Sequence, residues 1–317
     1  MDAYHLYLDV ASSIGYDAYS TISESSWFSE ALYGSLLFPE KEKDSLAFLE
    51  SLKRKDPKLK KLDIEQIRVR LKRCLDRHLE EIGWSEYRAI GFSICFSQLM
   101  SSLLYMKRIK ELHPKTLIIA GGSHCSSTLG STLVSTFQYI DLVVEGEGER
   151  PLLSILKLLR RGRGLRELEG VRGVVSKEKE PEGPWEIEDL NELPFPDFDD
   201  YFSQLKMLSS ERRFFARIPM EASRGCWYRG SSDRGCSFCN LNLQWKGFRY
   251  KDEGRVLSEI DYYLKRYQSI FFSFMDNLIP RQLVPGLFRE IRGSQRDLKI
   301  FLETRADVSL RELMVMR

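Results

Sequence analysis

The sequence lacks an excess of charge of either sign, a signal peptide and a membrane-spanning apolar run. Its 48 basic and 46 acidic residues leave a formal net charge of +2, which gives no electrostatic reason to expect nucleic acid as a partner. The N-terminus carries Asp2 and Asp9 and no basic leader. The charge-free stretch 89–106 contains Gly91 and four serines, which is too polar for a membrane span. We therefore expect a cytoplasmic protein without a membrane partner, whose cysteines are thiols, metal ligands or catalysts rather than disulfides.

Apolar periodicity divides the 317 residues into four segments. Residues 1–83 look helical and accessory, because their apolar residues recur at helical spacing. Residues 84–162 alternate apolar runs ("AIGFSICF", "TLIIAGG", "IDLVVEGEGE") with helical patterns, which is typical of a parallel, doubly wound sheet. Residues 163–210 are rich in Gly, Pro and acidic residues and are predicted to be a linker. Residues 211–317 read as strand–helix–strand–helix–strand and predict a second α/β unit.

Three of the six cysteines lie within fourteen residues of one another, and a fourth is missing. Cys226, Cys236 and Cys239 have the spacing C-x9-C-x2-C, and neither Cys nor His follows. A structural zinc site needs four tetrahedral ligands, and the fourth would have to be His124, Cys125 or a carboxylate. A 4Fe–4S cluster held by three thiolates leaves one iron open to a ligand, which explains the missing cysteine. Unrelated core cysteines are a third possibility, although the surrounding glycines and polar residues are typical of a loop.

The cysteine segment resembles radical S-adenosylmethionine (SAM) enzymes, whose usual spacing is C-x3-C-x2-C. Its wider first gap, together with "SRGCWYRG", "CSFCNLN" and "FRYKD", is similar to the radical SAM C-methyltransferases that mature ribosomally made peptides. "GFSICFSQ", "IIAGGSHC", "IDLVVEGEGE" and "LNELPFPDFDDYF" resemble, in that order, the cobalamin-binding domain and linker of this group. The early "SWFSEALYGSLLFPE" resembles its N-terminal region, so that the likeness runs over most of the chain. Two departures are a longer first gap and Asn240, which stands where a glycine is usual.

The resemblance implies a Rossmann-like cobalamin-binding domain followed by a partial, three-strand radical SAM α/β barrel. Because the group normally has an earlier strand and more barrel strands, we expect an N-terminally clipped and C-terminally truncated piece. The implied cofactors are a 4Fe–4S cluster, SAM and cobalamin, and the implied partners are a precursor peptide and a flavodoxin- or ferredoxin-type electron donor. The implied reaction is radical methylation of an unactivated carbon, chemistry that cofactors carry. Epimerisation, thioether formation, or an inactive cobalamin- or peptide-binding fragment are the alternatives.

The resemblance also implies roles for individual residues. Cys226, Cys236 and Cys239 would bind the cluster. The implied cofactor contacts of the second α/β unit are Phe238, Asn240, Asp276, Asn277, Glu303 and Arg305. Those of the first, next to cobalamin, are Ser93, Gly121, Gly122, Ser123, Gly146 and Gly148. The alternatives are a local core plug for Phe238, helix capping for Asp276 and Asn277, and ordinary turns for the glycines.

Overall fold

The computed structural model describes residues 2–25, 27–126, 128–163, 165–168, 171–178, 182–212, 214–230, 236, 238–239 and 247–317. Two compact units are formed, one by residues 3–185 and one by residues 186–317. The boundary between Trp185 and Glu186 falls inside the segment that the sequence pattern assigned to a linker.

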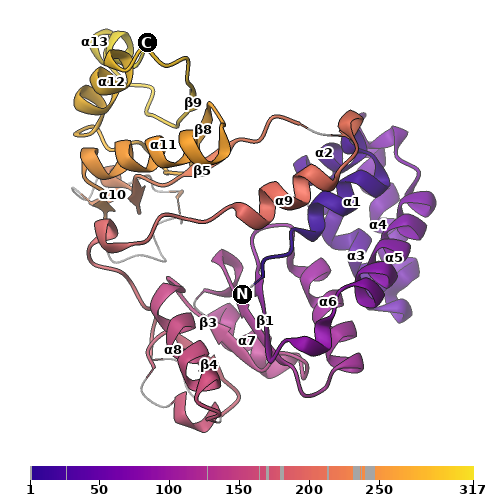
Figure 1. Cartoon of the computed structure of the whole chain (residues 1–317). Helices are drawn as coiled ribbons and strands as arrows, with labels where there is room; N and C mark the ends of the chain where they lie inside the picture. The colour runs from indigo at the N-terminus through magenta and orange to yellow at the C-terminus, as the bar shows by residue number, and fades with distance from the viewer. Residues whose placement is uncertain are drawn as a thin grey trace. The chain divides into compact units, whose positions relative to one another are not determined.

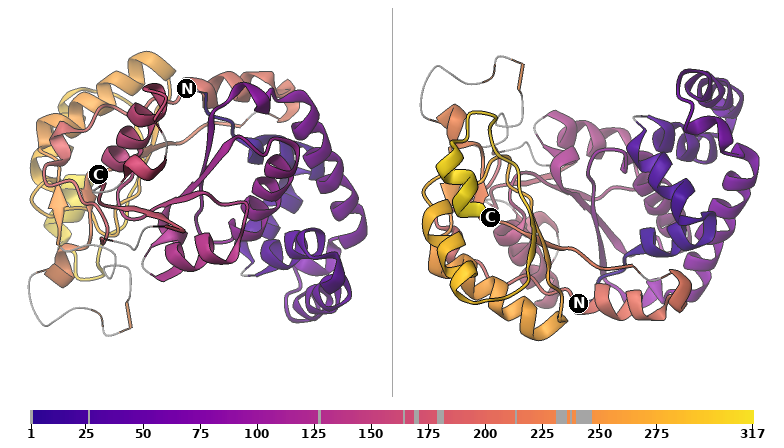
Figure 2. Two further views of the ribbon diagram at one scale, coloured as in Figure 1. Left: turned by 90° about the horizontal axis from the view of Figure 1, so that it is seen from below. Right: turned by 90° about the horizontal axis from the view of Figure 1, so that it is seen from above.

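The first unit opens with a group of helices that pack around a core of their own (Figure 2, indigo to purple). Their bounds are α1 Leu6–Ile14, α2 Tyr16–Glu24, α3 Phe28–Leu37, α4 Glu42–Lys55 and α5 Ile64–Glu81. Helix α5 begins where the Asp63 carboxylate accepts the Gln66 amide, which satisfies a backbone donor that the helix cannot. Cys74 on this helix is 2% exposed and belongs to this core. Among the described residues, no helix combines the length and the apolar content needed to cross a bilayer.

A four-stranded sheet forms the rest of the first unit. Its strands, in spatial order, are β1 Ala89–Ser93, β2 Leu117–Gly121, β3 Leu142–Val144 and β4 Val174–Ser176. The first three are parallel, and β4, from the segment predicted to be a linker, pairs antiparallel with β3. Its helices are α6 Leu99–Leu112, α7 Thr128–Thr136 and α8 Glu149–Arg160. Ile118 packs in one cluster with residues of α6 and α7, and its neighbour Ile119 packs in another with residues of α8. Alternate residues of one strand therefore face different layers, which confirms a doubly wound sheet.

The second unit contains a parallel sheet in the order β5 Ile218–Met220, β8 Phe271–Phe274, β9 Lys299–Phe301. Its helices are α9 Asp199–Met207, α10 Trp227–Gly230, α11 Glu253–Tyr267, α12 Val284–Gly293 and α13 Leu310–Met316. Helix α11 lies alongside the three strands (Figure 1), and its Val256, Ile260 and Tyr263 pack with β5 and β8 in one core. Within the described part of the chain this sheet is open and does not close into a barrel. The predicted fold class, α/β with a three-strand partial barrel, is confirmed.

Candidate functional site

The cysteine loop leaves the second unit through a narrow neck. Strand β6 (Ser223–Arg224) pairs antiparallel with β7 (Arg249–Tyr250), so that both ends of the loop are hydrogen-bonded together. Gly225 follows β6 with φ of +86°, and a Cβ added there would lie 2.7 Å from the Gly247 carbonyl oxygen. Only glycine allows this conformation and this approach, and Cys226 comes directly after it. The neck therefore fixes where the loop starts.

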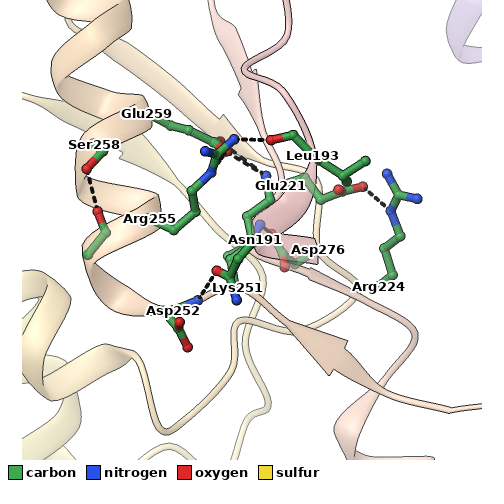
Figure 3. Close-up of polar contacts among 12 residues, drawn as sticks. Asn191, Leu193, Glu221, Arg224, Lys251, Asp252, Arg255, Ser258, Glu259 and Asp276 are labelled. Carbon is green, nitrogen blue, oxygen red and sulfur yellow. Dashed lines mark hydrogen bonds and ion pairs between the residues drawn. The ribbon is translucent and has the colours of Figure 1, made fainter. Parts of the chain in front are cut away.

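A buried ion pair anchors the neck to helix α11 (Figure 3). Lys251 Nζ lies 2.9 Å from Glu259 Oε1, and these residues are 2% and 1% exposed. Arg255 Nε reaches the same carboxylate oxygen at 3.0 Å. The Lys251 amide in turn donates to the Ala222 carbonyl oxygen at 2.8 Å, beside the loop's first limb. Buried charges are held only when each is paired, so this network specifies one arrangement of α11 and the neck. Sequence reasoning missed it, because these residues read as surface charges.

Asp276 and Asn277, which follow β8, form hydrogen bonds with residues 222–225, the first limb of the loop. Asp276 accepts hydrogen bonds from the Ala222 amide (3.1 Å) and from the Ser223 hydroxyl. Asn277 Nδ2 donates to the Gly225 carbonyl oxygen at 3.2 Å. Neither side chain caps helix α12, whose N-cap has no side-chain hydrogen bond, so the capping alternative is not observed. The structure brings these two predicted site residues to the base of the cysteine loop.

The Asp276 carboxyl group is electrostatically unusual. It is 4% exposed, and burial raises its pKa to about 6, while the hydrogen bonds from Ser223 and Ala222 partly oppose that rise. The pKa rises because the free energy that the carboxylate loses on leaving water exceeds the stabilisation that the two hydrogen-bond donors provide. A carboxyl group with a pKa near neutrality is a candidate for functional chemistry as well as for a structural role.

The loop cysteines lie near the surface of the second unit. Cys226 and Cys239 are half-buried and Cys236 is exposed, and none forms a disulfide. The Cys239 amide donates to the Cys236 carbonyl oxygen at 3.1 Å, so one turn carries both thiols. Phe238 within this turn is 90% exposed, which excludes a core plug and leaves its ring open to a ligand. Asn240 lies outside the described residues.

A mononuclear metal site is not formed by the loop cysteines as the structure places them. Within the described residues, the side chains close enough to share one ion are Asp9, Cys74 and His78 of the first unit. That group is a complete polar network, because Asp9 accepts from His78 at 2.7 Å and pairs with Arg77. The loop cysteines are not part of that group.

Glu303 and Arg305 follow β9 and approach the loop differently. Glu303 is exposed and contributes its backbone, whose carbonyl oxygen accepts the Ile279 amide at 3.0 Å. Arg305 lies over the ring of Tyr228, two residues after Cys226, with Cζ 3.7 Å from the ring centre. Of the two, Arg305 is the one whose side chain reaches the cysteine loop.

The residues predicted to approach cobalamin lie beyond the carboxyl ends of β1 to β3. Ser93 pairs with Gly121 at the ends of β1 and β2, and Ser123 follows in a short 3₁₀ turn. Gly122 has φ of +97°, and an added Cβ would lie 2.6 Å from the Ile94 carbonyl oxygen, so it permits the contact between these two loops. After β3, Gly148 stands at the N-cap of α8. This is the edge at which doubly wound sheets bind ligands.

Two buried polar atoms without partners flank Gly146 at this edge, and sequence reasoning missed both. Gly146 has φ of +76°, and its missing Cβ leaves room for the Trp185 carbonyl oxygen. Within the described structure, Glu145 Oε1 and Trp185 Nε1 are buried and accept or donate no hydrogen bond. Glu145 is 3% exposed, and burial raises its pKa. Buried polar groups are normally satisfied, so these atoms fit a ligand that carries amide groups, as cobalamin does. A charged residue directly after the run "LVV" was the available signal.

Comparison with known proteins identifies the fold. No protein-family model matches the chain. The structure of the apo, selenomethionine-labelled cobalamin-dependent S-adenosylmethionine radical enzyme OxsB matches with a TM-score of 0.55 at 17% identity, over 78% of this chain and 34% of that one. In fold, the chain resembles a cobalamin-dependent radical SAM enzyme.

Sequence likeness to curated proteins accompanies the likeness in fold to OxsB. An anaerobic magnesium-protoporphyrin IX monomethyl ester cyclase of Rubrivivax gelatinosus is 26% identical over 174 residues, which are 53% of this chain and 29% of the cyclase. An uncharacterized methyltransferase of Pyrococcus horikoshii is 27% identical over 220 residues, 67% of this chain and 44% of that protein. The chain thus spans less than half the length of either relative. These sequence likenesses cover parts of longer proteins, and the likeness to OxsB is one of fold.

Proposed function

We propose that the chain acts as a radical SAM C-methyltransferase that uses cobalamin and modifies an unactivated carbon of a ribosomally made peptide. The observation that carries this proposal is a loop with three cysteines, closed at its ends by β6 and β7, beside a parallel sheet, in a chain with a second, doubly wound sheet. The likeness to OxsB supports the same combination of units.

The chain's own residues would hold the cluster and SAM in defined places. Cys226, Cys236 and Cys239 would ligate a 4Fe–4S cluster with one iron open to SAM; the cluster, once reduced by a flavodoxin- or ferredoxin-type donor, would supply the electron for SAM cleavage. Asp276 and Asn277 hold the loop's first limb and thereby orient the first ligand. The exposed ring of Phe238 lies between two ligands, where it would pack on the adenine and exclude water from it.

The first unit would hold cobalamin at the carboxyl edge of β1 to β3. Glu145 Oε1 and Trp185 Nε1 would accept and donate hydrogen bonds to amide groups of the cofactor. Gly121 would leave the end of β2 without a side chain, and Gly122 permits the close contact of the two loops that follow β1 and β2 at that edge. A radical enzyme without cobalamin has no need for this unit, which favours methyl transfer over epimerisation or thioether formation.

A second candidate is a radical cyclisation of a tetrapyrrole-like substrate. It is favoured by the likeness to the cyclases of Rubrivivax gelatinosus and of Cereibacter sphaeroides, the latter 27% identical over 180 residues. The two candidates differ in the fate of the methyl group of SAM. With SAM labelled in that group, the methyltransferase transfers label to a precursor peptide and the cyclase does not.

The decisive experiment is anaerobic reconstitution with iron and sulfide, followed by electron paramagnetic resonance of the reduced protein with and without SAM. We expect a 4Fe–4S signal that changes on addition of SAM, because SAM would bind the open iron. The matched control is Cys95→Ala, a cysteine outside the loop, against Cys226→Ala. One zinc per chain and no cluster signal in the wild type would overturn the proposal.

A further inference from the structure

Two arginines cover the two aromatic residues that follow Cys226. Arg305 Cζ lies 3.7 Å from the centre of the Tyr228 ring, and Arg281 Cζ lies 5.1 Å from that of Trp227. Both rings belong to the short helix α10. A guanidinium over an aromatic face is attracted by the negative face of the ring. The loop's first turn is therefore covered from the side on which β8 and β9 end.

One carboxylate joins these two arginines. Asp307 Oδ1 accepts from Arg281 Nη2 at 3.2 Å and from Arg305 Nε at 3.1 Å. Arg281 also lies 3.6 Å from Glu312, which forms a capping box with Ser309 at the start of α13. The two guanidinium groups thus contact carboxylates as well as aromatic rings, which restricts the rotamers of both arginines.

The positive charge of Arg305 is directed toward the loop. Its side chain is 27% exposed, whereas that of Asp307 is 55% exposed, so water screens the carboxylate more than the guanidinium. The pKa of Arg305 is raised, chiefly by the hydrogen bond with Asp307, with smaller contributions from Tyr228 and Cys236. Because Arg305 lies over the Tyr228 ring, two residues after Cys226, its charge is placed at the first turn of the loop.

We propose that Arg305 is a positioning residue that fixes the turn after Cys226 and keeps a positive charge beside the bound cluster, which makes the cluster easier to reduce. This inference rests on the proposed function, because it needs a cluster on the three cysteines. A fixed cation stabilises the more negative, reduced state, and hydrogen bonds and charges are recognised determinants of cluster potential.

The test compares reduction midpoint potentials of the reconstituted cluster in Arg305→Gln, Arg305→Lys and wild type. Arg305→Gln removes the charge and Arg305→Lys keeps it. The matched control is Arg217→Gln, because Arg217 lies 4.5 Å over the ring of Phe271, the first residue of β8 in the same unit. We expect Arg305→Gln to lower the equilibrium constant of reduction about tenfold, which is about 59 mV for one electron. Arg305→Lys should stay within a few-fold of wild type, and Arg217→Gln should not change it.

The outcomes separate the inference from the proposed function. Potentials equal to wild type in both Arg305 variants, or equally lowered in both, overturn the electrostatic role. If Arg305→Gln binds no cluster, the positioning role is tested by hydrogen exchange of residues 223–230 in the cluster-free forms of Arg305→Gln and Arg217→Gln. Exchange faster than in Arg217→Gln supports positioning, and equal exchange overturns it. A wild type that takes up no cluster refutes the proposed function instead.

Discussion

The raised pKa of Asp276 predicts that this one carboxyl group makes the second unit less stable as the pH rises. In the unfolded chain its pKa is the ordinary 3.8, and in the folded chain it is about 6. Between these values the unfolded form releases its proton while the folded form retains it, so stability falls as pH rises through that window. Below pH 3.8 the group has no effect, and above pH 6 its full cost is present.

The size of the effect follows from the two pKa values. Their difference is about two units, and each unit is about 1.4 kcal/mol, so the cost above pH 6 is about 3 kcal/mol. Asp276→Asn keeps the shape and the acceptor for the Ala222 amide but cannot ionise. We therefore expect the variant to equal wild type near pH 3.5 and to exceed its free energy of unfolding by about 3 kcal/mol at pH 7.

The assay is urea unfolding of both proteins between pH 3.5 and 8, followed by hydrogen exchange of peptides that cover β5 and β8. These peptides report on residues 186–317 alone. The control is Asp297→Asn, which removes an exposed carboxylate of the same unit. A flat difference for Asp276→Asn, or one that falls with pH, would refute the reasoning and show that the hydrogen bonds outweigh desolvation.

Three further predictions concern the neck and the first unit. Glu259→Ala should lower the free energy of unfolding by about 3–5 kcal/mol in urea titrations, because it leaves the Lys251 charge buried without Glu259. Replacing both Lys251 and Glu259 by apolar residues of similar volume should restore most of the lost stability. Gly225→Ala should reduce the iron content after reconstitution severalfold, because its Cβ would meet the Gly247 backbone. The control is Gly254→Ala on α11, where a Cβ has open space and the iron content should be unchanged. Equal iron contents in the two variants would contradict the role of the neck. Glu145→Ala should weaken cobalamin binding about 5- to 150-fold in absorbance titrations, the equivalent of about 1–3 kcal/mol for one buried hydrogen bond, and unchanged binding would show that Oε1 does not meet the cofactor.

The strands that the sequence predicted are those whose signal is local. β2 and β3 are continuous apolar runs followed by glycine turns, because both faces of each strand are covered. β4 was missed, since Val174–Ser176 is a three-residue segment whose strand conformation depends on pairing with β3. Local patterns therefore predicted the fold class, while the fourth strand needed a partner from elsewhere in the chain.

For the site, the sequence predicted positions in the chain and not the residues that they contact. Asp276 and Asn277 were singled out because they end a strand, yet their partners lie 52 to 54 residues earlier. Lys251 and Glu259 look like solvated charges in the sequence and become buried only because α11 packs on the neck. Glu145 has no sequence feature beyond its place after β3, and its unpartnered oxygen follows from the packing of α7. Contacts between distant residues cannot be predicted from spacing alone.

The pinned neck has a consequence for how cysteine spacing is interpreted. The free-energy cost of closing this loop is met where β6 pairs with β7, and each doubling of the loop's length raises that cost by only about 0.6 kcal/mol. The nine residues between Cys226 and Cys236 therefore cost little more than three would. Insertions in this gap are thermodynamically cheap, so a search pattern with a fixed first gap would pass over chains built like this one, whereas a glycine at the neck followed by cysteine would find them.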